Sequence, residues 1–180
     1  MNGFMEKDYK IFDLFRNQWA LVSAGDIDDY NACTVSWGNF GTLWTRPDNQ
    51  DGAVITVYIH PGRYTYGFMK KSDIFTVSFF PEKYRKALGY MGSHSGRNED
   101  KSAVAGLTPF SVDHNVRFKE ASLTFVCRKI YQHQFAKEDI AQDVQDYYKA
   151  NPKAYPVNEQ GEWEPHWMFV GEIKEVMENK

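Results

Sequence analysis

The chain has 180 residues, about the size of one domain with a substantial core. Its formal net charge of −3 argues against a general nucleic-acid binder or a protein that docks on anionic membranes. The 13 Phe, 11 Tyr and 5 Trp favour a β-rich core, and they also suit a planar ligand or an oligomer interface. We therefore expect a single domain over residues 1–180.

The cysteines, the histidines and the N-terminal segment indicate the class of protein. Five histidines and two cysteines show no metal-ligand spacing, and Cys33 and Cys127 lie in apolar, strand-like runs that are typical of buried reduced thiols. The first dozen residues mix charged and aromatic side chains, unlike a signal peptide. No apolar run approaches the roughly 18 residues that span a bilayer. We expect a soluble, cytoplasmic protein.

The predicted elements are mostly strands, with a few helices between them. Alternating or β-branched apolar residues predict strands at 19–25, 31–37, 53–59, 74–80 and 166–176, with a strand pair within 116–135. Helical spacing predicts helices at 65–71, with Thr65 as a possible cap, at 81–91 and near 138–149. This order predicts a mainly β fold, a β-barrel with helical additions, and it lacks the regular alternation of a doubly wound sheet.

The segment 89–109, GYMGSHSGRNEDKSAVAGLTP, has the chemistry of an anion site. Its small residues let a ligand approach the backbone, its hydroxyls donate hydrogen bonds, and Arg97 and Lys101 supply positive charge. One phosphate group is the simplest ligand, and a solvated polar loop is the alternative. The segment 92–96 only superficially resembles the nucleophile elbow of a serine hydrolase, because its central residue is His94.

Two further segments suit a phosphorylated, planar cofactor. In the strand NACTVSWG, Thr34 and Ser36 share one face and Trp37 follows, so hydroxyls and amides could bind the edge of a flat heterocycle beside the indole. These could also be ordinary strand and core residues. In HPGRYTY, Arg63, the Thr65 hydroxyl and the start of a helix form a second phosphate-type site. A capped helix with an exposed arginine is the alternative.

Four segments in this order resemble the flavin reductase-like family of the flavoredoxin type. They are NACTVSWG, YIHPGRYTYGFMKKSDIFTVSFF, SHSGRNEDK followed by AGLTP, and HWMFVGEI, and the resemblance covers residues 21–176. It implies the FMN-binding split barrel, a homodimer, and FMN held near the subunit interface. The chain departs from the commoner pattern at Cys33, where we expect methionine or another apolar residue.

The resemblance also implies roles for individual residues. Asn31, Thr34, Ser36 and Trp37 match the strand along the isoalloxazine, although a turn role competes for Asn31. The other implied cofactor-binding residues are Arg63, Thr65 and Tyr66 toward the ribityl phosphate, and His94, Ser95, Gly96, Arg97 and Lys101 in the second cofactor loop. His166 matches a histidine near the open face of the flavin, on the substrate side.

Two functions are compatible with this resemblance. The first is an NAD(P)H-dependent flavin reductase, in which NADH or NADPH gives hydride to FMN and a small acceptor takes the electrons. The second is an FMN-holding electron carrier that a redox partner protein reduces. The flavin supplies the reactive chemistry in both, which agrees with the lack of paired carboxylates in the sequence, and we assign no catalytic residue. The sequence favours neither NADH nor NADPH.

Overall fold

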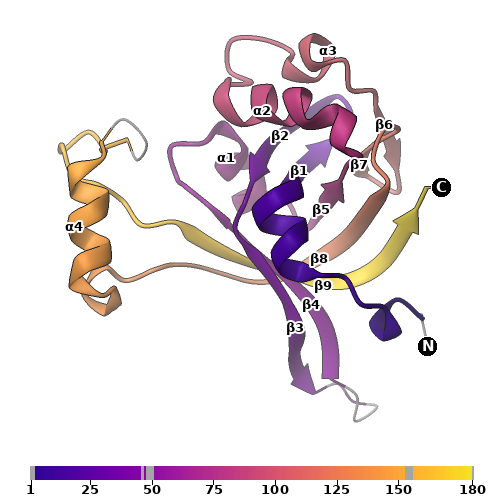
Figure 1. Cartoon of the computed structure of the whole chain (residues 1–180), viewed down its shortest axis with the longest axis horizontal. Helices are drawn as coiled ribbons and strands as arrows, with labels where there is room; N and C mark the ends of the chain where they lie inside the picture. The colour runs from indigo at the N-terminus through magenta and orange to yellow at the C-terminus, as the bar shows by residue number, and fades with distance from the viewer. Residues whose placement is uncertain (1–2, 46, 48–50, 153–155, 180) are drawn as a thin grey trace.

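The computed structural model describes residues 3–45, 47, 51–152 and 156–179 (Figure 1). Its strands are β1 (Ala20–Asp26), β2 (Asp29–Val35), β3 (Gly38–Thr45), β4 (Asp51–Ile59), β5 (Ile74–Phe79), β6 (Pro109–Val112), β7 (Asn115–Phe118), β8 (Leu123–Gln134) and β9 (Trp167–Glu178). Its helices are α1 (Tyr64–Lys71), α2 (Arg85–Ser93), α3 (Lys101–Ala105) and α4 (Gln142–Ala150). Shorter helical turns are η1 (Gly3–Glu6), η2 (Asp13–Gln18), η3 (Glu82–Tyr84) and η4 (Lys137–Asp139).

One antiparallel sheet organises the molecule. Its seven strands follow the order β2-β1-β5-β8-β9-β4-β3, and β6 and β7 form a separate hairpin. The long strands β8 and β9 carry register shifts between Val126 and Cys127 and between Lys129 and Tyr131, where bulges let the sheet bend. In Figure 1, α2 and α3 lie over the end of the sheet that contains β1 and β2. Helix α4, which follows β8 and precedes β9 in the chain, stands away from the body. A mainly β fold with helical additions is confirmed.

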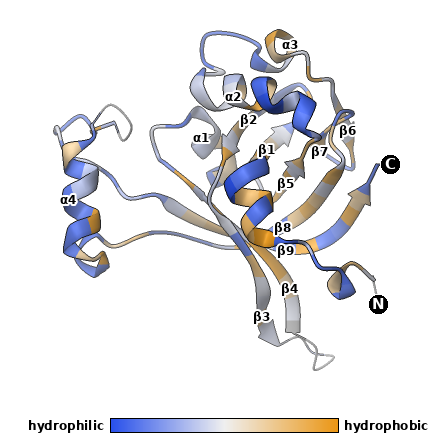
Figure 2. Ribbon diagram, in the orientation of Figure 1, coloured by the Kyte–Doolittle hydropathy of each residue, from blue (hydrophilic) through white to orange (hydrophobic). Residues whose placement is uncertain are grey.

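The sheet packs against apolar residues on both of its faces. A larger core includes the rings of Phe75, Phe79, Phe125 and Phe169, all 1% exposed or less. A second core lies beneath α2 and β7 and includes Leu88. Strand β1 contributes to both cores through alternate residues, which accounts for its continuous apolar sequence. In the second half of β9, hydrophilic residues are interspersed with hydrophobic ones (Figure 2).

Most predicted elements are confirmed, but three details are wrong. The strands within 116–135 do not pair with each other, because β7 pairs with β6 while β8 lies between β5 and β9. Thr65 does not cap α1, whose N-cap is Arg63 and whose cap makes no side-chain hydrogen bond. The polar segment 89–109 contains helix α3, whose first turn is capped by the Asp100 carboxylate on the Ala103 N–H. Strands β3 and β6 were not predicted.

Both cysteines are buried free thiols, as predicted. Across the described ranges, no cluster of three or more His, Cys, Asp or Glu side chains could hold a metal ion. Within the same residues, none of the helices combines the length and the apolar character that crossing a membrane requires.

Gly171 lies where three parts of the core meet, and we expect its replacement to destabilise the fold. A Cβ at this position of β9 would lie 2.5 Å from Phe75 Cζ and 2.6 Å from Cys127 Cβ. We expect Gly171→Ala to lower the free energy of unfolding by about 1–3 kcal/mol through overpacking. Gly41→Ala in β3 is the matched control, because its Cβ would meet no atom within 4 Å. Equal denaturation midpoints for the two variants would contradict this packing.

Candidate functional site

Two cavities adjoin where β2 and β4 end and α1 begins. The larger one has a volume of about 430 Å³ and the smaller one about 110 Å³. Cys33, Gly62 and Arg63 line both. The other residues of the larger cavity are Thr34, Val35, Ser36, Trp37, Tyr58, Ile59, His60, Pro156 and His166. Those of the smaller cavity are Tyr64, Thr65, Met91, Ser93, His94, Ser95, Arg97 and Lys101.

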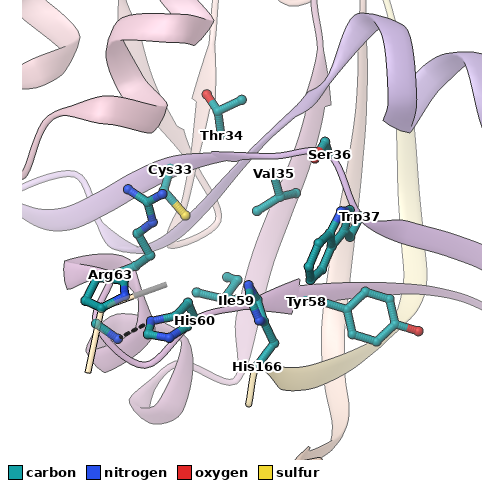
Figure 3. Close-up of a pocket in the computed structure, with 12 residues that line it drawn as sticks. Cys33, Thr34, Val35, Ser36, Trp37, Tyr58, Ile59, His60, Arg63 and His166 are labelled. Carbon is teal, nitrogen blue, oxygen red and sulfur yellow. Dashed lines mark hydrogen bonds between the residues drawn. The ribbon is translucent and has the colours of Figure 1, made fainter. Parts of the chain in front are cut away.

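Strand β2 presents its Cys33 and Val35 face to the larger cavity. Figure 3 shows both side chains pointing into it, while Thr34 points to the other side. The Thr34 hydroxyl donates to the Leu88 carbonyl at 2.6 Å, because α2 packs over that face of β2. The Thr34 hydroxyl, which was expected to face a ligand, therefore faces α2. Thr34 and Ser36 still border the cavity, and Thr34 can donate to a ligand there only through its main chain, since its hydroxyl proton is already engaged.

Aromatic and imidazole rings form the opposite wall of the larger cavity. The centroid of the Trp37 ring lies 4.6 Å from that of His166, and the His60 centroid lies 5.2 Å from His166 (Figure 3). Trp37 keeps 42% of its surface exposed, so its indole can cover a flat ligand. Tyr148, from α4, packs behind this wall, 6.5 Å from Trp37 and 6.3 Å from His166 between centroids. The wall thus joins segments that are more than a hundred residues apart.

Both histidines of the larger cavity are neutral near pH 7. Burial, followed by the proximity of His60 and Arg63, lowers the pKa of His166 to about 3. Burial and Arg63 also lower the pKa of His60. The Gly62 N–H donates to His60 Nδ1 at 3.0 Å, which assigns the remaining ring proton to Nε2. Arg63 therefore supplies the positive charge at the junction of the two cavities.

The smaller cavity is lined by three cationic side chains. Arg63 donates from Nη1 to the Gly92 carbonyl at 2.6 Å, which fixes it against the end of α2. The Arg97 guanidinium lies 4.8 Å from the centroid of the Tyr64 ring. Lys101 is 5% exposed and donates to the carbonyls of Ala32 and Met91, at 2.7 and 3.0 Å, which uses two of its three N–H donors. Burial lowers the pKa of Lys101.

Hydroxyl and imidazole groups complete the smaller cavity. His94 stacks on Tyr90 with centroids 3.7 Å apart, and its Nδ1 lies 3.0 Å from Ser93 Oγ. The Ser95 hydroxyl accepts the Arg97 N–H at 3.3 Å. Cations and hydroxyls around a volume of this size fit one phosphate group, and the adjoining larger cavity can take a flat ring system.

Four of the predicted residues lie at the border of the site or outside it. The Thr65 hydroxyl donates to Asn31 Oδ1 at 2.7 Å, a buried link that joins α1 to β2, and Thr65 also lines the smaller cavity. Asn31 and Gly96 border a neighbouring cavity, and a Cβ at Gly96 would overlap the Asn31 amide. Tyr66 borders neither cavity, because its ring packs against Trp167 and Phe169 at 5.5 and 6.4 Å.

Several residues of the site were not predicted from the sequence. Cys33 was noted only as a departure from the pattern, although its thiol side faces the site and burial raises its pKa. The turn at 60–62 was recognised, but the role of His60 as a wall residue was not. For Tyr148 the sequence contains no signal, because its position beside Trp37 depends on how α4 is carried between β8 and β9.

Comparison with known proteins shows which family the chain matches. The family model described as a flavin reductase like domain matches residues 12–180. No curated protein sequence matches the chain. Flavoredoxin from Methanosarcina acetivorans has a TM-score of 0.64 at 19% identity, over 91% of this chain and 69% of that one.

Two other solved structures share the fold. An FMN-binding protein from Thermus thermophilus, with bound p-hydroxybenzaldehyde, has a TM-score of 0.64 at 21% identity, over 100% of this chain and 78% of that one. An NADH:FAD oxidoreductase from Streptomyces globisporus, in complex with NAD and FAD fragments, has a TM-score of 0.58 at 12% identity, over 90% of this chain and 74% of that one. These likenesses confirm the predicted split-barrel fold.

Proposed function

Because the chain belongs to the flavin reductase-like family, we propose that it binds FMN and transfers reducing equivalents from NADH or NADPH to a small acceptor. The observation that carries this proposal is the pair of adjoining cavities, one larger and walled by rings and one small and cationic, joined at Arg63. The resemblance found in the sequence points to the same cofactor.

In this proposal the residues of the two cavities divide the work of binding. Arg63, Arg97 and Lys101 hold the phosphate, with the Ser95 hydroxyl as a donor beside them. The Cys33 and Val35 face of β2 lies along one side of the flat ring, and Trp37 with His166 borders the side from which a nicotinamide would approach. Bound FMN would supply the chemistry, accepting hydride at N5 and passing electrons on. The neutral imidazoles of His60 and His166 add no charge beside the ring.

Anaerobic reduction by a nicotinamide tests this function. We expect NADH or NADPH to bleach the flavin of the FMN-loaded protein within seconds, because Trp37 and His166 leave a face on which a nicotinamide can stack. Flavin absorbance in a stopped-flow instrument measures the step. Reduction by dithionite but by neither nicotinamide would instead favour the electron carrier, whose reductant is a partner protein.

We also propose that the protein is a homodimer. Exposed aromatic side chains lie on β3 and on or just after β8, with Trp44 50%, Tyr131 40% and Phe135 42% exposed. The Trp44 and Tyr131 rings are 6.2 Å apart, and aromatic surface of this kind favours an interface. We expect light scattering to give the mass of two chains and Tyr131→Glu to shift it toward one. A wild-type monomer that still binds FMN tightly would contradict a site shared between subunits.

A further inference from the structure

A third cavity lies on the segment between β8 and β9 that carries α4, which we call the arm (residues 135–166). Its volume is about 460 Å³. The residues that line it are Lys137, Gln145, Tyr148, Lys149, Pro152, Val157, Gly161, Glu162 and Trp163. None of them lines the two cavities already described, so this arm cavity requires an explanation of its own.

The arm cavity combines aromatic rings with lysines. Trp163 is 6% exposed and its ring centroid lies 5.3 Å from that of Tyr148. The Lys137 ammonium lies 5.3 Å from the centroid of the Trp163 ring and 3.1 Å from a Glu162 carboxylate oxygen. Lys149 supplies a second cation. Aromatic surface beside two ammonium groups suits a flat heterocycle that carries phosphate.

Tyr148 connects the arm cavity to the larger cavity. It lines the former, and its ring packs against Trp37 and His166, which line the latter. Pro156 and Val157, adjacent in the chain, likewise border the larger cavity and the arm cavity respectively. The two cavities therefore share a wall at Tyr148, and a ligand that extends past this ring would reach both.

The relative positions of the cavities indicate whether the flavin or a second ligand reaches the arm. The cationic cavity joins the larger one at Cys33 and Arg63. Trp37 and His166 lie away from Arg63 (Figure 3), and both contact Tyr148 of the arm. A flavin with its phosphate beside Arg63 directs any extension of that phosphate away from the arm. A second ligand, stacked against the ring from the Trp37 side, extends toward it.

We propose that the arm cavity binds the adenosine diphosphate end of the reduced nicotinamide dinucleotide, while its nicotinamide enters the larger cavity. The dinucleotide gives hydride from nicotinamide C4 and leaves oxidised, and the bound flavin is reduced. Lys137 and Lys149 hold the diphosphate, and Tyr148 with Trp163 contacts the adenine. This inference rests on the proposed function, which it extends by locating the donor's second half.

Titration with ADP-ribose, which lacks the nicotinamide, tests the arm cavity without any redox reaction. We expect calorimetry on the FMN-loaded protein to show saturable binding that weakens about 5- to 20-fold in Lys149→Ala and in Lys137→Ala. Lys83→Ala is the matched control, because this lysine lies 5.2 Å from the centroid of the Tyr84 ring, outside the arm. No binding by the wild type, or equal affinity in all three variants, would overturn the proposal.

Kinetics with two donors separates this inference from the proposed function. We expect Lys149→Ala to raise the KM for the whole dinucleotide and to leave the KM for reduced nicotinamide mononucleotide unchanged. Equal changes for both donors would overturn the arm assignment. If neither donor reduces the wild-type flavin, the reductase function fails, while loss of ADP-ribose affinity in Lys149→Ala still supports the arm cavity.

The adenosine diphosphate group also occurs in FAD. Comparing the affinities for FMN and FAD shows whether the arm cavity binds this part of FAD instead of the nicotinamide dinucleotide. We expect Lys149→Ala to bind FMN and FAD in the same affinity ratio as the wild type does. A selective loss of FAD affinity would assign the arm cavity to the flavin and overturn the nicotinamide assignment.

Discussion

Arg63→Ala is expected to weaken FMN binding by about 1.5–3 kcal/mol, which is roughly 10- to 150-fold. Among the residues that the structure describes, Arg63 is the one cation that lines both cavities, and its bond to the Gly92 carbonyl holds its guanidinium beside the smaller one. Losing a charge-assisted contact to phosphate should affect FMN far more than riboflavin, which has no phosphate. Fluorescence titration of both flavins measures the difference.

The riboflavin comparison also separates binding from folding. If Arg63→Ala merely loosens the end of α2, both flavins lose affinity together. Arg128→Ala is the matched control, since this exposed arginine pairs with Glu172 on the sheet and lies outside both cavities. An Arg63→Ala protein that keeps the full preference for FMN, while Arg97→Ala or Lys101→Ala loses it, would show that the phosphate lies deeper in the 93–101 loop.

Stability should fall as the pH is lowered below about 6.5, and His166 should account for much of the change. Its folded pKa of about 3 lies below its ordinary value of 6.5, so between these values the unfolded chain binds a proton that the folded chain does not. The contribution of His166 to the free energy of unfolding is complete above pH 6.5 and is lost as the pH falls toward 3. The free energy of unfolding should fall by at most about 1.4 kcal/mol per pH unit on account of His166. The loss summed down to pH 5 is then about 2 kcal/mol.

Urea denaturation between pH 5 and 7.5 measures this dependence as a slope, which is insensitive to the absolute stability of a variant. We expect His166→Gln to flatten the slope but not to abolish it, because the pKa of buried His60 is also lowered. His133→Gln, at an exposed position of β8, should leave the slope unchanged. A slope equal to that of the wild type in His166→Gln would mean that water reaches this imidazole in the folded state.

The comparison of sequence and structure is most instructive at β2. The period-two pattern correctly predicted a strand and its two faces. Neither face is simply exposed to solvent, because α2 packs on one and the other lines the larger cavity. Alternation alone cannot distinguish two such faces, so the sequence favoured the hydroxyl face for the ligand, whereas the Cys33 and Val35 side chains are the ones that point into the larger cavity. Strand β3 escaped prediction because its glycines and exposed polar residues weaken the apolar alternation.

Local sequence was sufficient for features whose cause is local. The β-branched runs determined β4 and β5, the arginine before α1 marked a cationic segment, and Arg97 with Lys101 marked another. Together with the order of four motifs, these identified the family and its fold. Only the tertiary structure decided that Arg63 reaches the Gly92 carbonyl, that Tyr66 faces Trp167, and that Tyr148 meets Trp37. These contacts join segments far apart in the chain, and their geometry depends on the bend of the sheet and on the path of the arm, which no local pattern specifies.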